Sequence, residues 1–179
     1  MAAHAPRSFF LAGTMQGSRS GAAMVDQSYR RQLREVILEH HPLAEVTCPL
    51  DLMAEWLGPQ ADDVRAAHAR LAERTLVERD RLEPPLLDLV SVFHRLADRA
   101  AACDVCVAWL PDREPSMGTA VEMAAAFRRG RTVVAITELT QNLAVLACSN
   151  VIVPGLADFD ALLARGALFG RAVHTGGPG

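Results

Sequence analysis

The sequence of 179 residues contains no lysine, and its 18 basic residues other than histidine are all arginine. With 21 acidic residues the formal net charge is −3, so the chain has no general excess of positive charge. This argues against binding along a nucleic-acid backbone, although it is compatible with a local pocket for a small anion. We therefore expect a small-molecule ligand and no nucleic-acid partner.

Cysteine is also scarce, and the four cysteines are scattered, which argues against a disulfide framework. Cys103 and Cys106 form a CxxC pair, but Cys106 falls within an apolar run that indicates a buried strand. Buried cysteines of this kind behave as small hydrophobic residues. We prefer that interpretation to a redox or zinc site, and we expect no metal and no other cofactor.

Long apolar runs are absent as well. None approaches the roughly 20 residues that span a bilayer, and Met1 to Ser8 carries one arginine and no apolar core. We therefore expect a cytoplasmic protein with no membrane partner. Because 50% of the residues are hydrophobic, residues 1–179 are expected to form one domain with its own core. Residues 1–7 and the Gly- and Pro-rich segment 174–179 are expected to be disordered.

Short apolar runs alternate with helical patterns along the chain. Three runs are continuous, as expected for strands covered on both faces of a parallel sheet, and they are Phe9–Ala12, Val105–Leu110 and Thr132–Ile136. Two weaker strands are expected at Glu45–Cys48 and Asn150–Val153. Helical periodicity is found over Asp26–His40, about Asp62–Arg81, Pro85–Ala102, Met117–Arg129, Leu139–Ala147 and Ala157–Phe169. This alternation predicts an α/β fold with an open parallel sheet. Residues 56–85 are long for a crossover, so we expect a helical excursion or lid, with a plain solvated helix as the alternative.

In such a sheet a ligand binds beyond the carboxyl ends of the strands, next to the loops Gly13–Val25, Pro49–Gln60 and Pro111–Gly118. The first loop begins with Gly-Thr-Met-Gln-Gly-Ser-Arg-Ser-Gly and leads into a helix. Its glycines, hydroxyls and Arg19 are suited to binding a phosphate, but a flexible surface loop has a similar composition. It matches neither the Walker loop nor the dinucleotide GxGxxG pattern.

The third loop ends at Ser116, which is placed to cap a helix whose N-terminus faces the same edge of the sheet. Glu122 follows six residues later, in mostly apolar company. A solvated glutamate is the ordinary explanation of such a residue. If it is buried beside a sugar, however, the carboxylate can act as nucleophile or general base, because a reacting anomeric carbon develops positive charge.

These segments resemble the nucleoside 2-deoxyribosyltransferase-like superfamily. The resemblance rests on Phe-Leu-Ala-Gly at the first strand, on the Gly/Ser/Arg loop, and on Ser-x-Gly-Thr-x-x-Glu from Ser116 to Glu122, and it covers about residues 8–137. It implies a Rossmann-like (flavodoxin-like) five-stranded parallel sheet with helices on both faces, a homodimer, and Glu122 as the carboxylate that attacks C1′. The motifs are closest to members that hydrolyse nucleoside 5′-monophosphates.

In those hydrolases the glycine loop and the serine before the helix hold the 5′-phosphate. The matching positions are Thr14, Gln16, Gly17, Ser18, Arg19 and Ser116, with Gly13, Gly118 and Thr119 as further motif positions. The resemblance therefore implies a nucleotide substrate rather than a nucleoside.

Two positions depart from the family pattern. Phe10 stands where deoxy-specific members have a tyrosine, which implies that a ribose is accepted. Leu96 stands where many members carry an aspartate that assists the departing base. The candidates for a relocated acid or base are His94, Asp98 one helical turn from it, and Asp51 after the second strand. A packing or surface histidine is the alternative for His94.

The sequence supports three hypotheses. The first is hydrolysis of the N-glycosidic bond of a nucleoside 5′-monophosphate, with Glu122 as nucleophile and free base and sugar 5-phosphate as products. The second is transfer of the sugar to another base, which differs only in what attacks the intermediate. The third is nucleotide binding without catalysis. In the first hypothesis the base would stack on Met15, Trp56 or Trp109, of which Trp56 is better placed in a mobile loop.

Overall fold

A computed structural model describes residues 8–17, 19, 23–166 and 168. Its centre is a five-stranded parallel sheet with the strand order β2-β1-β3-β4-β5. The strands are β1 (Ser8–Gly13), β2 (Glu45–Thr47), β3 (Val105–Trp109), β4 (Thr132–Ile136) and β5 (Val151–Val153). The predicted Rossmann-like α/β sheet is confirmed, and each expected strand lies within about one residue of its predicted place.

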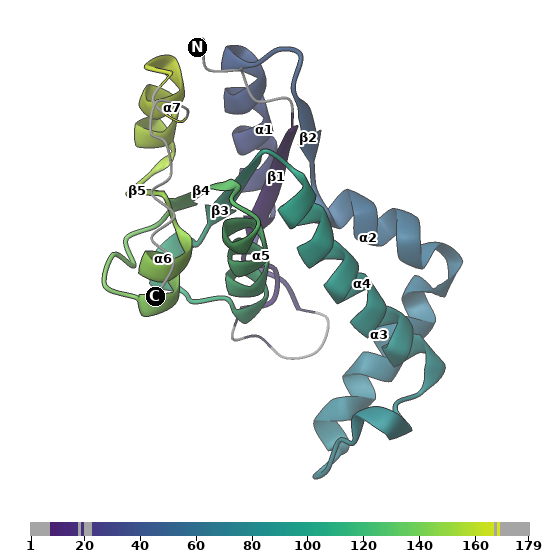
Figure 1. Cartoon of the computed structure of the whole chain (residues 1–179). Coiled ribbons are helices and arrows are strands. Elements are labelled where there is room, and N and C mark those ends of the chain that lie inside the picture. Colours follow the sequence, from purple (N-terminus) through teal and green to yellow (C-terminus); the bar gives the residue numbers. More distant parts are fainter. Residues whose placement is uncertain (1–7, 18, 20–22, 167, 169–179) are drawn as a thin grey trace.

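Seven α-helices connect and follow the described strands. They are α1 (Tyr29–His40), α2 (Pro49–Leu57), α3 (Ala61–Arg70), α4 (Pro84–Ala102), α5 (Met117–Arg128), α6 (Leu143–Cys148) and α7 (Leu156–Ala164). Helices α1 and α7 cover one face of the sheet, and α4, α5 and α6 lie on the other (Figure 1). The expected helices on both faces are therefore confirmed.

Two cores result from the alternation of side chains along the strands. Phe9 and Leu11 of β1 pack with Leu33 and Ile37 of α1. Phe10, on the opposite side of the same strand, belongs to the core that α2, α3, α4, α5 and α6 complete. Both cores include side chains of β1 and β3, so these two strands are packed on both faces.

Three predicted segments were wrong. The expected loop Pro49–Gln60 is helix α2 followed by a 3-10 turn, because Pro49 occupies the first helical turn, where its missing N–H and fixed φ are favourable. The expected helix Asp62–Arg81 ends at Arg70, since residues 72–81 are exposed and have no apolar face to bury. The helix expected from Leu139 begins at Leu143, where the Asn142 side chain accepts hydrogen bonds from Ala144 N and Val145 N.

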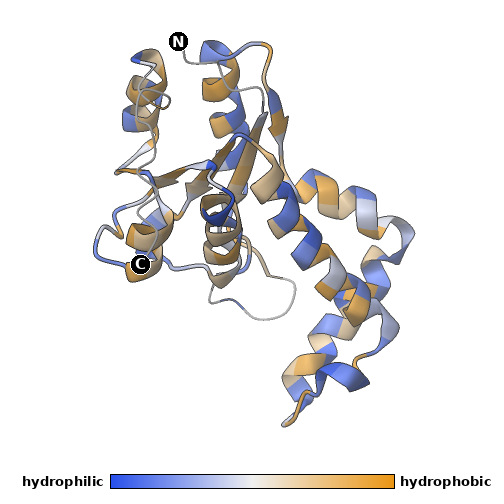
Figure 2. Cartoon of the chain, in the orientation of Figure 1, coloured by the Kyte–Doolittle hydropathy of each residue, from blue (hydrophilic) through white to orange (hydrophobic). Residues whose placement is uncertain are grey.

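The last predicted helix, Ala157–Phe169, is confirmed as α7 up to Ala164, and Phe169 lies outside the described residues. The two ends expected to be disordered also lie outside them. The segment around α3 projects away from the sheet beside the first half of α4 (Figure 1). Along α3 and α4 hydrophilic and hydrophobic residues are mixed, as expected for helices with one covered side (Figure 2).

Candidate active site

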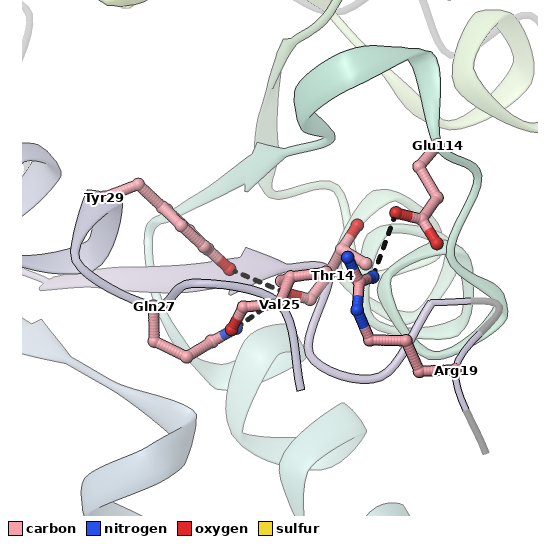
Figure 3. Close-up of polar contacts among 6 residues, drawn as sticks. All are labelled: Thr14, Arg19, Val25, Gln27, Tyr29 and Glu114. Carbon is pink, nitrogen blue, oxygen red and sulfur yellow. Dashed lines mark hydrogen bonds and ion pairs between the residues drawn. The ribbon is translucent and has the colours of Figure 1, made fainter. Parts of the chain in front are cut away.

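The start of the glycine loop is fixed by side chains from the segment leading into α1. The backbone oxygen of Thr14 accepts hydrogen bonds from Tyr29 Oη at 3.2 Å and from Gln27 Nε2 at 3.1 Å (Figure 3). Gln27 Nε2 also donates to Val25 O at 2.9 Å, and Val25 N donates to Met15 O at 2.7 Å. The two arms of the loop are therefore held together at its base.

Two glycines in this loop have steric reasons to be glycine. A Cβ at Gly13 would lie 2.4 Å from Tyr29 Oη, so any side chain there would displace the tyrosine. Gly17 has a φ of +59°, and a Cβ on it would lie 2.2 Å from Glu114 Oε1. The Glu114 carboxylate therefore sits directly against the glycine backbone of the loop.

Glu114 joins the glycine loop to the loop that follows β3. Its Oε2 accepts from Arg19 Nη1 at 3.3 Å, and the side chains are 43% exposed for Arg19 and 23% for Glu114 (Figure 3). Just before it, Asp112 and Arg113 both have positive φ, at 54° and 59°. Non-glycine residues in this region cost free energy and are found at sites where the structure holds a functional geometry. The strained turn at Asp112 and Arg113 directly precedes Glu114, whose carboxylate contacts Arg19.

Helix α5 begins as the sequence predicted. Ser116 Oγ accepts a hydrogen bond from Thr119 N at 3.3 Å and another from Thr119 Oγ1 at 2.9 Å. One helical turn further, Glu122 is only 5% exposed. The helix thus presents capped N–H groups at its start and a buried carboxylate on its next turn, along the side that faces the sheet.

Burial raises the pKa of Glu122 from its ordinary 4.5 to about 8, and the charge of Arg30 opposes this rise. Burial also raises the pKa of Tyr29 to about 12, with Arg30 lowering it and Glu122 raising it. The buried thiol of Cys106 has its pKa raised by burial first and by the Glu122 charge second. A carboxyl group with such a perturbed pKa, close to a ligand-binding edge, is typical of catalytic sites.

The remaining predicted site residues lie in different surroundings. Phe10 is fully buried in the core, and Thr14 is fully buried with an Oγ1 that finds no hydrogen-bond partner. Gly118 faces Phe93 of α4, 3.6 Å from the position of its absent Cβ. Gln16 is half-buried and Ser18 is outside the described residues. Within the glycine loop, Gly17 and Arg19 both lie in contact with Glu114.

The candidates for the leaving-group acid are exposed. His94 and Asp98 lie on the solvent side of α4, and within the described part of the chain neither forms a hydrogen bond or ion pair. Asp51 is exposed at the start of α2 and pairs with Arg34 at 3.2 Å. Leu96, at the position of the family aspartate, is buried in the core. The role predicted for these three polar residues stays a prediction.

The residues expected to stack against a base are already in contact with other side chains. The Arg95 guanidinium lies over the Trp56 ring at 3.7 Å, and the Trp109 ring is 5.3 Å from that of Tyr29. A separate apolar cavity of about 170 Å³ lies between α5 and α6, with Leu110, Ser116 and Met123 in its wall. It adjoins the helix start, on the α6 side of Ser116.

Sequence reasoning missed Arg30. This residue is on α1 and is only 4% exposed, and its Nη2 donates to Gly13 O at 3.1 Å. The signal was present in its spacing, because Arg30, Leu33 and Ile37 follow the i, i+3, i+7 pattern of the buried face of a helix. Arginine on such a face is rare without partners, so this spacing predicts a buried and paired arginine.

Neither a cluster of metal-ligating side chains nor a helix able to cross a membrane is present among the residues that the structure describes.

No protein-family model matches this sequence, and no curated protein matches it. Solved structures do resemble it. A 2-deoxyribosyltransferase from Bacillus psychrosaccharolyticus is 16% identical, with a TM-score of 0.51 over 87% of this chain and 95% of its own. A conserved protein from Enterococcus faecalis V583 is 14% identical, with a TM-score of 0.52 over 90% and 99%.

The CMP N-glycosidase BcmB from Clostridium botulinum is 15% identical and superposes less closely, with a TM-score of 0.41 over 90% of this chain and 99% of its own. The first two likenesses show that the chain has the fold of these proteins.

Proposed function

We propose that this protein hydrolyses the N-glycosidic bond of a nucleoside 5′-monophosphate, with Glu122 as the nucleophile. The observation that carries the proposal is the burial of Glu122 about one turn from the capped start of α5, on a helix that packs against β1 and β3. A buried carboxylate is suited to meet the positive charge that develops at C1′ when the bond to the base breaks. The resemblance of the Ser116 to Glu122 motif points to the same role.

In the proposed reaction the ionised Glu122 attacks C1′ and the base departs with a proton. Water then attacks C1′ of the glycosyl-enzyme intermediate and releases the sugar 5-phosphate with retention of configuration. Because burial raises the pKa of Glu122 to about 8, only a minority of molecules carry the nucleophile in its ionised form at pH 7. The reaction is then carried out by the protein molecules in which Glu122 is ionised.

The glycine loop and Arg19 are the proposed phosphate site. Backbone N–H groups, the guanidinium and the start of α5 together favour an anion at this edge. Phosphate contacts remote from C1′ would position the sugar against Glu122, which supplies rate through orientation. His94 and Asp98 are the proposed candidates for the proton donor to the base.

The proposal is tested by incubating the protein with ribo- and deoxynucleoside 5′-monophosphates and separating free base by chromatography. Release of base from at least one monophosphate, but not from the matching nucleoside, is expected. If no monophosphate is cleaved and none raises the melting temperature, the assignment of the glycine loop is wrong. Light scattering in the same experiment tests the homodimer that the resemblance implies.

A second candidate is transfer of the sugar to another base, which is favoured by the shared fold with a 2-deoxyribosyltransferase. Both reactions share the same covalent intermediate and differ in whether water or a base attacks it. Adding a second free base to the assay separates them. A new nucleotide identifies transfer, whereas an unchanged yield of sugar 5-phosphate identifies hydrolysis.

A further inference from the structure

Strand β1 extends beyond the end of its neighbour β2. The two strands pair only from Ser8 opposite Glu45 to Phe10 opposite Thr47, whereas β1 continues to Gly13. Thr14 N points to β3, where it donates to Trp109 O, so the carbonyls of Leu11 and Gly13 point to the side that β2 leaves open. Two backbone acceptors at the active-site end of β1 therefore need donors from elsewhere.

Arg30 supplies them. Its Nη1 donates to Leu11 O and its Nη2 to Gly13 O at 3.1 Å, so one guanidinium spans the open edge of the strand. Its Nε donates to Gln27 Oε1 at 2.8 Å, and Gln27 in turn holds Thr14 O. The planar fork of arginine fits two carbonyls on one strand, which the single ammonium of a lysine does not.

Among the described residues, the hydrogen-bond acceptors of Arg30 are neutral oxygen atoms, and none of them belongs to a carboxylate. Burying a charge in this way costs free energy unless an opposite charge lies near. Within the described part of the chain, Glu122 interacts electrostatically with Arg30 and Tyr29 of α1 and with Cys106 of β3. Burial keeps the tyrosine and the thiol neutral near pH 7, so Arg30 is the charged member of this set.

We propose that Arg30 is a positioning residue for the reaction: fixed on the open edge of β1, it supplies the buried positive charge against which the Glu122 carboxylate ionises. The inference rests on the proposed function of Glu122. One residue then does two things, since it shapes the end of the strand from which the glycine loop departs and it keeps the nucleophile available. Arg30 itself does not touch the substrate.

The variants Arg30→Gln and Arg30→Lys separate the two contributions. Glutamine keeps a donor for a backbone carbonyl but removes the charge, whereas lysine keeps the charge but cannot span both carbonyls. With Arg30→Gln we expect the acid limb of the profile of kcat/KM against pH to move upward by about 1 pH unit or more. Activity at pH 7 then falls about tenfold, because the ionised fraction of Glu122 falls by that factor. Arg30→Lys is expected to keep the position of the limb.

The matched control is Arg31→Gln, on the same helix, whose side chain is 77% exposed and pairs with Glu35. It should leave the limb unchanged. A normal profile with Arg30→Gln would overturn the proposal and leave Arg30 as a purely structural partner of β1.

A stability cycle tests the charge coupling without any turnover. Arg30→Gln, Glu122→Gln and the double variant are unfolded with urea at pH 6 and at pH 9. At pH 9 the Glu122 carboxylate is ionised, so Arg30→Gln should destabilise the protein more than at pH 6, and this difference should vanish in the Glu122→Gln background. An Arg30→Gln chain that folds only together with Glu122→Gln also supports the coupling.

If the effect of Arg30→Gln is the same at both pH values, or if neither the single nor the double variant folds, the coupling is refuted. The cycle and the assay also distinguish the two proposals. If the stability cycle shows coupling but no monophosphate releases its base, the electrostatic interaction between Arg30 and Glu122 is supported and the proposed reaction is refuted.

Discussion

Glu114 and Glu122 are eight residues apart in the chain, each interacts with an arginine, and the two differ in burial. Glu122 is 5% exposed, and Arg30 acts on it from the interior. Glu114 has a side chain that is 23% exposed and contacts Arg19 directly at the edge of the sheet. A buried charge is costly to leave unopposed, whereas an exposed pair contributes little and is easily exchanged for a ligand. Glu122 is thus suited to act as a nucleophile, and Glu114 is suited to be displaced from Arg19 by an anionic ligand.

The largest effect should come from the interior. Glu122→Gln keeps the shape of the side chain but removes the nucleophile, so base release should fall by about three orders of magnitude or more. Binding of inorganic phosphate, measured by calorimetry, should persist. Glu35→Gln on the exposed side of α1 is the control, because Glu35 is exposed and forms a surface pair with Arg31. Full turnover by Glu122→Gln would remove the proposed mechanism.

The burial of Glu122 should also be visible in the pH dependence of stability. Its folded pKa of about 8 lies above the unfolded 4.5, so the folded protein holds this proton more tightly. The corresponding stability is complete below pH 4.5 and is lost as the pH rises to about 8. Between pH 5 and 9 the wild type should lose ~2–4 kcal/mol more than Glu122→Gln. Parallel urea-denaturation curves for the two proteins at all pH values would contradict the burial.

At the outer pair, Arg19→Ala should weaken phosphate binding and raise KM for a nucleoside 5′-monophosphate by about tenfold to a hundredfold. This is the range expected for the loss of one charge-assisted hydrogen bond. The activity of the exposed control Arg31→Ala should not change. If Arg19→Ala alters kcat alone, the phosphate does not bind at Arg19.

The sequence predicted the sheet and the position of Glu122 in α5 because both depend on local signals. Continuous apolar runs indicate buried strands, and the serine cap fixes where α5 begins, which places Glu122 on its next turn. Arg30 and Glu114 were missed because their importance depends on distant partners. The spacing of Arg30 with Leu33 and Ile37 indicates that its side chain is buried, but its proposed role depends on β2 ending three residues before β1. The position of Glu114 depends on a turn with two positive φ angles, which no local pattern of the sequence indicates.

The smallest expected effect concerns Glu114 itself. Its carboxylate contacts Arg19 and the backbone of Gly17, where the proposed phosphate would bind, so the two anions compete. Because an exposed ion pair contributes about 1 kcal/mol at most, Glu114→Gln should tighten phosphate binding by no more than about fivefold. Calorimetric titration with inorganic phosphate measures this directly, with Glu138→Gln as an exposed control at the same edge. Weaker binding by Glu114→Gln would mean that Glu114 orients Arg19 for the ligand, and the outer pair would then be part of the site and not its competitor.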